Sequence, residues 1–270
     1  MKATVLVDNI AKEDLQGEWG LCIYIEYEGK KILLDAGGSN LFLTNAQKLG
    51  LSIEDVDYAV LSHAHYDHAN GMTGFFEHNQ KANFFLQETA AENCYSKYLF
   101  FYTYIGLPKH ILTDYKDRIT FAKGDFELMP GVYLIPHKTP GLEQIGKRER
   151  MYQRTNKKGT WDNFSHEQSL VFDTDKGLVI FNSCSHGGAV NIVNEVSRTF
   201  PDKKVYALIG GFHLFNKSGE EIREVAKKLN DTGVSYVCTG HCTRGRAYNI
   251  LSETLGDKLH RLHVGLEMEF

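Results

Sequence analysis

The stretch Leu61-Ser62-His63-Ala64-His65-Tyr66-Asp67-His68 decides how this chain is interpreted, because four metal-binding side chains fall within six residues behind a short apolar run. Alternate residues of an extended segment share one face, so His63 and His65 can present two imidazoles to one cation. Small residues follow, and the turn that they predict would bring Asp67 and His68 to a second cation roughly 3.5–4 Å from the first. Chance explains four ligands at this spacing poorly. The stretch therefore predicts a two-metal hydrolytic centre.

The composition of the chain restricts its class. A chain of 270 residues with 42% hydrophobic and 24% charged residues can bury a large core as one domain with an insertion. A net charge of −4 and a pI near 6.3 argue against a general attraction to nucleic acid. The N-terminus reaches charge too soon for a signal peptide, and no apolar run approaches the length of a membrane span. We expect a cytoplasmic protein with no nucleic-acid or membrane partner. The five scattered cysteines disfavour a disulfide framework.

Strand and helix signals recur in the same order in both halves of the chain. The predicted strands cover residues 2–7, 21–27, 31–35, 58–61, 168–172, 177–181, 205–209 and 234–238, and the predicted helices 39–49, 189–200, 218–231 and 245–255. Strands this apolar need cover on both faces. We therefore predict an α/β fold of the αββα sandwich type, in which two mixed β-sheets pack face to face with helices outside. The chain is expected to form a single domain over 1–270.

Residues from about 88 to 165 break this order and predict an inserted cap-like segment over the mouth of the site. They hold an aromatic cluster and a cationic one, which suit a flat ring with an anionic tail. The aromatic cluster is Tyr98, Phe100, Phe101, Tyr102 and Tyr104, and the cationic one is Lys147, Arg148 and Arg150. A solvated surface excursion is an equal alternative for the charged run 146–158. Exposed aromatic side chains also serve interfaces, so a homodimer contact is the rival interpretation.

Other histidines lie where predicted strands end in glycine-rich loops, which let side chains converge. His186 and His241 are expected to bind metal. His213 is expected to act as an acid, base or oxyanion donor, and metal binding or a substrate contact is the alternative. His166 and Glu167 precede a strand and are candidate substrate contacts, although His166 is equally a candidate ligand.

Two weaker groups of candidate ligands remain. His137 is a further histidine that could complete the metal site, but it lacks the loop context. Three cysteines lie beside the site loops: Cys184, Cys238 and Cys242. A cysteine is most often a small buried hydrophobe, so thiolate ligation is the minor alternative for these three.

A family resemblance rests on five segments: Leu61-Ser-His-Ala-His-Tyr-Asp-His68, Glu167-Gln-Ser-Leu170, Cys184-Ser-His-Gly187, Ile209-Gly-Gly-Phe-His213 and Thr239-Gly-His-Cys-Thr243. Together they resemble one branch of the metallo-β-lactamase superfamily, the branch named for 7,8-dihydropterin-6-methyl-4-(β-D-ribofuranosyl)aminobenzene-5'-phosphate synthase. The resemblance implies the metallo-β-lactamase fold and a metal centre between the sheet edges. By position it also implies two ligand sets, namely His63, His65 and His186, and Asp67, His68 and His241.

The chain departs from this pattern at two places. The general superfamily bridges its metals with an Asp after the second-half hairpin, whereas this chain reads Asn182-Ser-Cys-Ser-His186 there. The branch tends to carry Glu-His-Gly near the N-terminus, and here the sequence is Glu18-Trp19-Gly20. Flavodi-iron relatives usually carry Glu where His65 stands, so iron redox chemistry is disfavoured. Neutral imidazoles favour two Zn²⁺ ions, and Mn²⁺ or Fe²⁺ also suit such sites.

The leading hypothesis is a metal-dependent hydrolase whose two divalent cations activate water and polarise the scissile group of a small, phosphorylated or pterin-like substrate. Asp67 and His213 are the predicted catalytic residues. One alternative is dihydropterin-type synthase or lyase chemistry at the same centre. Another is a non-catalytic, metal-stabilised ligand-binding protein. An open coordination position would favour an enzyme, and saturated metals would favour the binding protein.

Overall fold

The computed structural model describes residues 1–12, 14–155 and 158–270 and contains two seven-stranded sheets. The first sheet has the order β18 (Glu267–Glu269), β1 (Lys2–Val7), β2 (Cys22–Tyr27), β3 (Lys30–Leu34), β4 (Tyr58–Val60), β5 (Phe84–Gln87) and β8 (Ile119–Ala122). Its strands are antiparallel from β18 to β3 and parallel from β3 to β8. The first sheet is therefore mixed, as predicted.

The second sheet has the same mixed character. Its order is β17 (Leu259–Arg261), β16 (Tyr236–Thr239), β15 (Val205–Gly210), β14 (Gly177–Phe181), β13 (Gln168–Thr174), β10 (Val132–Pro136) and β9 (Phe126–Met129). The strands are parallel from β17 to β14 and antiparallel from β14 to β9. The strand predicted over 234–238 begins later in the structure, at Tyr236. Ser235 lies just before it and donates its N–H to the Tyr206 carbonyl of β15.

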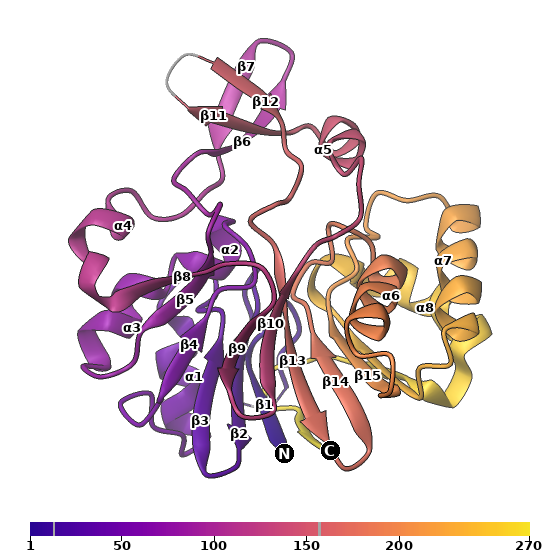
Figure 1. The fold of residues 1–270 in the computed structure, drawn as a ribbon, viewed down its shortest axis with the longest axis horizontal. Helices are drawn as coiled ribbons and strands as arrows, with labels where there is room; N and C mark the ends of the chain where they lie inside the picture. Colours follow the sequence, from indigo (N-terminus) through magenta and orange to yellow (C-terminus); the bar gives the residue numbers. More distant parts are fainter. Residues whose placement is uncertain (13, 156–157) are drawn as a thin grey trace.

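Helices cover the outer face of each sheet (Figure 1). The first sheet carries α1 (Leu41–Lys48) and α3 (Met72–His78), and the second carries α6 (Ala189–Thr199), α7 (Gly219–Asp231) and α8 (Arg244–Leu255). Strand β1 shows why both faces need cover: Val5 packs between the sheets, whereas Leu6 packs in the outer cluster with Phe42 of α1. Each such side chain contributes about 1.5–3 kcal/mol when fully buried. The predicted αββα sandwich is confirmed.

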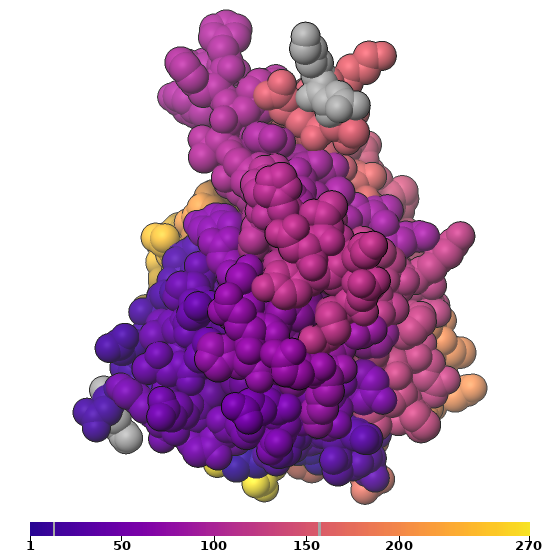
Figure 2. Space-filling model, turned by 90° about the vertical axis from the view of Figure 1, so that its left-hand side faces the viewer, coloured from indigo at the N-terminus to yellow at the C-terminus, as the bar shows by residue number. Residues whose placement is uncertain are grey.

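A third sheet of four strands stands beyond one end of the sandwich and projects from the surface (Figures 1 and 2). Its order is β12 (Lys158–Trp161), β11 (Met151–Thr155), β6 (Cys94–Tyr98) and β7 (Phe101–Tyr104), and α5 (Glu143–Glu149) lies beside it. The range 88–165 is thus not one inserted piece, because β8, β9 and β10 within it belong to the sandwich. The sequence concealed these strands since each is only four or five residues long. Residues 156–157 of the predicted charged run lie outside the described residues.

The other helices of the described residues are short: α2 (Tyr66–Ala69), α4 (Ile111–Asp114) and the 3-10 turns η1 (Lys116–Arg118), η2 (His241–Thr243) and η3 (Gly256–Lys258). Among the described residues, no helix is long and apolar enough to cross a membrane.

Candidate metal centre

Four loops that follow parallel strands meet at the end of the sandwich nearest the third sheet (Figure 1). The His-rich stretch follows β4, and the loops 182–188, 211–213 and 240–243 follow β14, β15 and β16. The carboxyl ends of parallel strands share one edge of a sheet, and ligands bind there in open α/β sheets. One helical turn, α2, carries Asp67 and His68 and begins directly after His65, before most of the small residues at which the change of direction was predicted.

The first predicted ligand set comes together. Ligand nitrogens of His63, His65 and His186 all lie within 4.8 Å of one another, and the three side chains are buried. His63 Nε2, His65 Nε2 and both nitrogens of His186 find no hydrogen-bond partner among the described residues. Burial and the neighbouring imidazoles lower the pKa of all three, to about 4 for His65. Neutral, unpaired imidazoles that share one point are the ligands that a Zn²⁺-like cation requires.

The second set also comes together. Asp67 Oδ2 lies 3.7 Å from His68 Nε2 and 3.4 Å from His241 Nε2. Burial raises the pKa of Asp67, but His68 and His241 lower it more, so the carboxylate is ionised. Burial lowers the pKa of His68, and Asp67 with Asp35 raises it to about 9. Without a metal ion, the His68 ring is therefore protonated on both nitrogens, and a bound metal ion would displace one of these protons.

Asp35 orients these ligands from the end of β3, although the sequence showed only that it sits at a strand end. Its buried carboxylate lies 2.8 Å from His68 Nδ1 and accepts the Ser62 N–H and hydroxyl at 2.7 and 2.8 Å. It also accepts the hydroxyl of Ser183 from the second half of the chain. Ser62 Oγ in turn lies 2.9 Å from His63 Nδ1. Such partners fix which imidazole nitrogen faces the metal and typically change affinity by about 10–100-fold.

His241 is held by the end of β1, a contact that the sequence did not reveal. Asp8 accepts the His241 N–H at 2.8 Å, and Asn9 Oδ1 lies 3.2 Å from His241 Nδ1. The backbone of His241 has a φ of 46°, in the left-handed region. The Asp8 contact helps to hold this strained conformation, which leaves Nε2 facing Asp67.

Glu167 and His137 organise the loop that carries His186. Glu167 is fully buried, accepts the N–H groups of His186 and Gly187 at 3.0 and 3.1 Å, and pairs with His137. His137 Nδ1 lies 3.1 Å from Glu195 Oε2. Burial lowers the pKa of His137, but the two carboxylates raise it to about 10. His137 is thus a buried cation between two acids rather than a metal ligand, and the position of Glu167 argues against its predicted contact with substrate.

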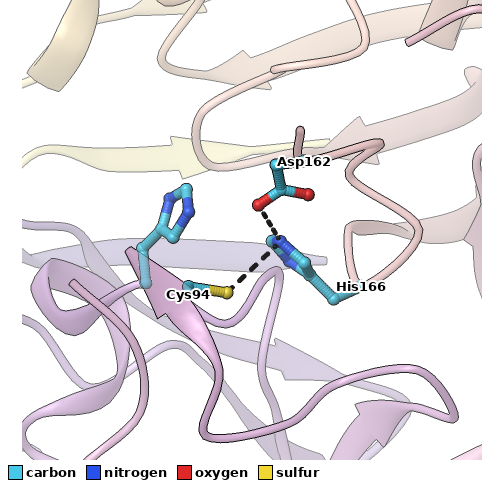
Figure 3. A group of neighbouring side chains, drawn as sticks. Cys94, Asp162 and His166 are labelled. Atoms are coloured by element: carbon cyan, nitrogen blue, oxygen red, sulfur yellow. Dashed lines mark hydrogen bonds and ion pairs between the residues drawn. The ribbon is translucent and has the colours of Figure 1, made fainter. Parts of the chain in front are cut away.

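His166 lies in a second buried cluster with Asp162 and Cys94 (Figure 3). Its Nδ1 accepts the Ala64 N–H at 3.1 Å, and its Nε2 lies 3.1 Å from Asp162 Oδ2 and 3.7 Å from Cys94 Sγ. A neutral ring protonated at Nε2 satisfies both hydrogen bonds. A cation at Nε2 would remove the proton that Asp162 accepts, while Nδ1 is already an acceptor. The geometry favours a structural role for His166, and it disfavours both metal binding and the predicted substrate contact.

A cavity of about 250 Å³ opens beside the two sets. Its lining includes His65, Asp67 and His186 from the ligand sets, Trp19 from the loop before β2, His213 and Phe215 from the loop after β15, and Glu149 and Met151 from the region of the third sheet. The His213 ring centroid lies 4.5 Å from that of His186. The cavity therefore places His213 where a bound molecule would meet it.

Glu149 of α5 approaches His213, which the sequence did not predict because Glu149 stands in a charged run. Its Oε2 lies 3.6 Å from His213 Nε2, and the same carboxylate pairs with Asn216 and Lys217. Burial lowers the pKa of His213, but Cys242 and Glu149 raise it to about 9. His213 is thus protonated near neutral pH. This state suits a general acid, or a donor of a hydrogen bond to an anion, better than a general base.

Comparisons with known proteins agree with this geometry. Residues 20–149 match the family model of the metallo-beta-lactamase superfamily. A relative from Methanocaldococcus jannaschii, 7,8-dihydropterin-6-methyl-4-(beta-D-ribofuranosyl)-aminobenzene-5'-phosphate synthase, is 31% identical over 264 residues, which cover 93% of this chain and 90% of the relative. The chain belongs to the metallo-β-lactamase superfamily.

Solved structures place the fold in the same superfamily. The crystal structure of a metal-dependent hydrolase of the β-lactamase superfamily matches with a TM-score of 0.84 and 28% identity, and the match covers 100% of this chain and 99% of that one. Zn²⁺-bound PqqB from Methylobacterium extorquens matches over 100% of both chains with a TM-score of 0.60 at 10% identity, which shows the shared fold alone.

The predicted cationic cluster does not line the 250 Å³ cavity beside the two ligand sets. Lys147, Arg148 and Arg150 are exposed, and none of the three is among the described residues that line it. Arg148 pairs with Glu149 and with Glu221 at 3.3 and 3.6 Å. The Arg150 guanidinium lies 4.9 Å from the Tyr98 ring centroid. Arg148 does line a smaller cavity of about 120 Å³ together with His186 and His213, whereas Lys147 and Arg150 line neither cavity. The positions therefore give some support to substrate binding by Arg148 and none to binding by the other two.

Proposed function

We propose that this protein is a metal-dependent hydrolase with two divalent cations, Zn²⁺ being the first expectation. One observation carries the proposal: two groups of buried ligand atoms lie side by side at a cavity, and four of the imidazoles have nitrogens with no hydrogen-bond partner among the described residues. The ligands would be His63, His65 and His186 for one cation, and Asp67, His68 and His241 for the other.

The bound cations would supply Lewis acidity and a water of lowered pKa. The protein side chains add the rest of the chemistry. Asp67 is an ionised acceptor that can orient a water molecule from the cavity wall. His213, protonated and backed by Glu149, can donate a proton to a leaving group or a hydrogen bond to a developing anion. Trp19 and Phe215 give the cavity an apolar wall that limits access of water.

The substrate is proposed to be a small flat ring with an anionic group. A second cavity of about 410 Å³ shares Trp19 with the first and is lined by Arg244 and Arg261. The Arg244 guanidinium lies 4.9 Å from the Trp19 ring centroid, and that of Arg261 lies 4.0 Å from the Tyr248 ring. Aromatic faces beside guanidinium groups suit a phosphorylated, pterin-like molecule. These arginines take the role first expected of Lys147, Arg148 and Arg150.

A second candidate function is synthase or lyase chemistry at the same centre. The observation that favours it is the name of the Methanocaldococcus jannaschii relative, which is that of a synthase, together with its 31% identity over most of the chain. Superfamily membership alone does not choose, because one fold hosts many reactions. Both functions use the same ligands and cavities.

The test combines metal analysis with an activity screen. The purified protein should hold two equivalents of metal and hydrolyse a compound within a panel of phosphate esters, phosphodiesters, lactones and thioesters. Product formation only from a pterin-type condensation would favour the synthase. Metals saturated by protein ligands without turnover of any compound would favour a binding protein.

A matched pair of variants tests the anionic subsite. Arg261→Gln should raise KM for a phosphorylated substrate and leave metal content unchanged. Arg246→Gln is the control, because Arg246 lies outside the cavity lining and donates to the Lys217 carbonyl. Equal KM values for both variants would remove the subsite from the proposal.

A further inference from the structure

Cys184 lies between the two proposed ligand sets. It sits in the loop between β14 and α6, is 3% exposed, and its Sγ is 3.3 Å from His68 Nε2. The sulfur takes part in three groups of possible ligands, and within each group the ligand atoms lie within 4.8 Å of one another. The partners of Cys184 are His63 and His68 in one group, His186 and His213 in another, and His241 and Cys242 in the third. Its neighbours thus include two members of the first set and two of the second.

We propose that the Cys184 thiolate binds both cations and bridges them. This inference rests on the proposed two-metal function. Zinc bond lengths of about 2.0–2.1 Å to nitrogen and 2.3 Å to sulfur place a nitrogen and a sulfur on one tetrahedral ion roughly 3.6 Å apart. The observed 3.3 Å between Cys184 Sγ and His68 Nε2 is close to that separation. A sulfur with several lone pairs can then reach a second ion on its other side.

The chemistry of the loop supports a sulfur bridge. Two divalent ions roughly 3.5–4 Å apart repel each other, and an anionic ligand between them offsets that repulsion. The loop Asn182-Ser-Cys-Ser-His186 contains no carboxylate, so Cys184 is the residue in it that can supply an anion. Binding breaks the S–H bond, forms two sulfur–metal bonds and releases one proton to solvent. No electron is transferred.

Cys242 supplies the matched comparison. Its Sγ lies 3.5 Å from Cys184 Sγ and is equally buried, but it accepts the His213 backbone N–H at 3.2 Å. Cys184 is instead placed by its neighbours, since Ser183 donates to Asp35 and Ser185 N–H donates to Asn182. The two sulfurs therefore differ in what holds them, and only Cys184 is assigned the bridge.

The experiment loads metal-free protein with Co²⁺ and follows thiolate-to-cobalt charge-transfer absorption in the near ultraviolet. We expect the wild-type band to grow over both equivalents, with release of one proton for the thiol. Cys184→Ser should lose the band, whereas Cys242→Ser should keep it. Thermal melts confirm that the variants fold. The titration of the wild-type protein is a separate test, which stands even if a variant fails to fold.

Three results would overturn the bridge, and they separate it from the proposed function. A wild-type band that saturates after the first equivalent would make Cys184 a terminal ligand. Two bound equivalents with no band, or a band kept by Cys184→Ser, would remove Cys184 from the centre and leave the two-metal function standing. Fewer than two bound equivalents would sink the two-metal function and the bridge together.

Discussion

His63 and Asp67 are assigned to different proposed ligand sets, although only Ala64, His65 and Tyr66 separate them in the chain. We predict that His63→Ala and Asp67→Ala each lose bound metal and activity, because each removes a bond to a different cation. Stability should fall as well, since metal binding adds to the free energy of folding. Elemental analysis of the purified variants measures the loss.

The control is His78→Ala, because His78 is exposed and, among the described residues, its side chain bonds only to the Gly74 carbonyl of its own helix. Full metal content in both His63→Ala and Asp67→Ala would mean that the two-site assignment is wrong.

Substitution of His213 distinguishes a role in proton transfer from a role in metal binding. We predict that His213→Ala keeps two metals but lowers kcat by roughly 10²–10⁴-fold, the usual range for a positioned proton-transfer group. Loss of one metal equivalent would instead place His213 among the ligands.

Glu149→Gln tests the contact that raises the pKa of His213. This pKa is about 9, held up by Cys242 and Glu149 against the effect of burial. Removing the Glu149 charge should lower it. If the protonated form is the active one, the alkaline limb of the kcat profile should then move to lower pH. An unmoved limb in a variant with normal metal content would disconnect Glu149 from catalysis.

At the scale of elements, the β6–β7 hairpin carries the most exposed apolar side chains. Leu99, Phe100 and Phe101 at its tip are 68%, 91% and 74% exposed. Exposed apolar groups that adjoin one another mark contact surfaces. We predict that Phe100→Ser converts a homodimer to a monomer in analytical ultracentrifugation, with kcat unchanged because the tip does not line the cavity. A wild-type protein that is monomeric at all concentrations tested would contradict this prediction.

The elements also show what the sequence could predict. Local sequence pattern was enough to predict the apolar strands β1 and β14 to within one residue. It was also enough for helix α6, which has a glycine before it and a proline after it. Strands β8, β9 and β10, which lie at or next to a sheet edge, were missed because such short strands have little pattern, and only their partners in the sandwich define them. Helix α1 begins later than predicted, at Leu41, and the Ser39 hydroxyl before it donates to Glu18 and accepts the Leu41 N–H.

For the whole molecule, the meeting of the proposed ligands at one end of the sandwich was predictable, and the groups that hold those side chains were not. Histidines and aspartates at strand ends can be found by spacing, because the sheet brings strand ends together. Asp8, Asp35 and Glu149 act on residues far away in the chain, through contacts that exist only after the sandwich has closed. Local sequence carries no record of such partners.

His137 gives a prediction about the stability of the whole fold. It joins the end of β10 to Glu167 before β13 and to Glu195 of α6, so it connects three elements through one buried charge. Its pKa is about 10 in the folded protein and about 6.5 in an unfolded chain. A raised folded pKa stabilises fully below the unfolded value, and the stabilisation is lost as pH rises through the folded value.

We therefore predict that the difference in unfolding free energy between wild type and His137→Gln is largest at pH 6.5 and shrinks toward pH 10. Removing one partner of a buried charge pair typically costs about 3–5 kcal/mol, which sets the expected size at the lower pH. Urea titrations of metal-free protein measure it, because metal binding has its own pH dependence. Comparing two proteins at each pH cancels the titration of groups that they share, such as His68. A difference that stays constant between pH 6.5 and pH 10 would mean that His137 stabilises the fold by packing and not by its charge.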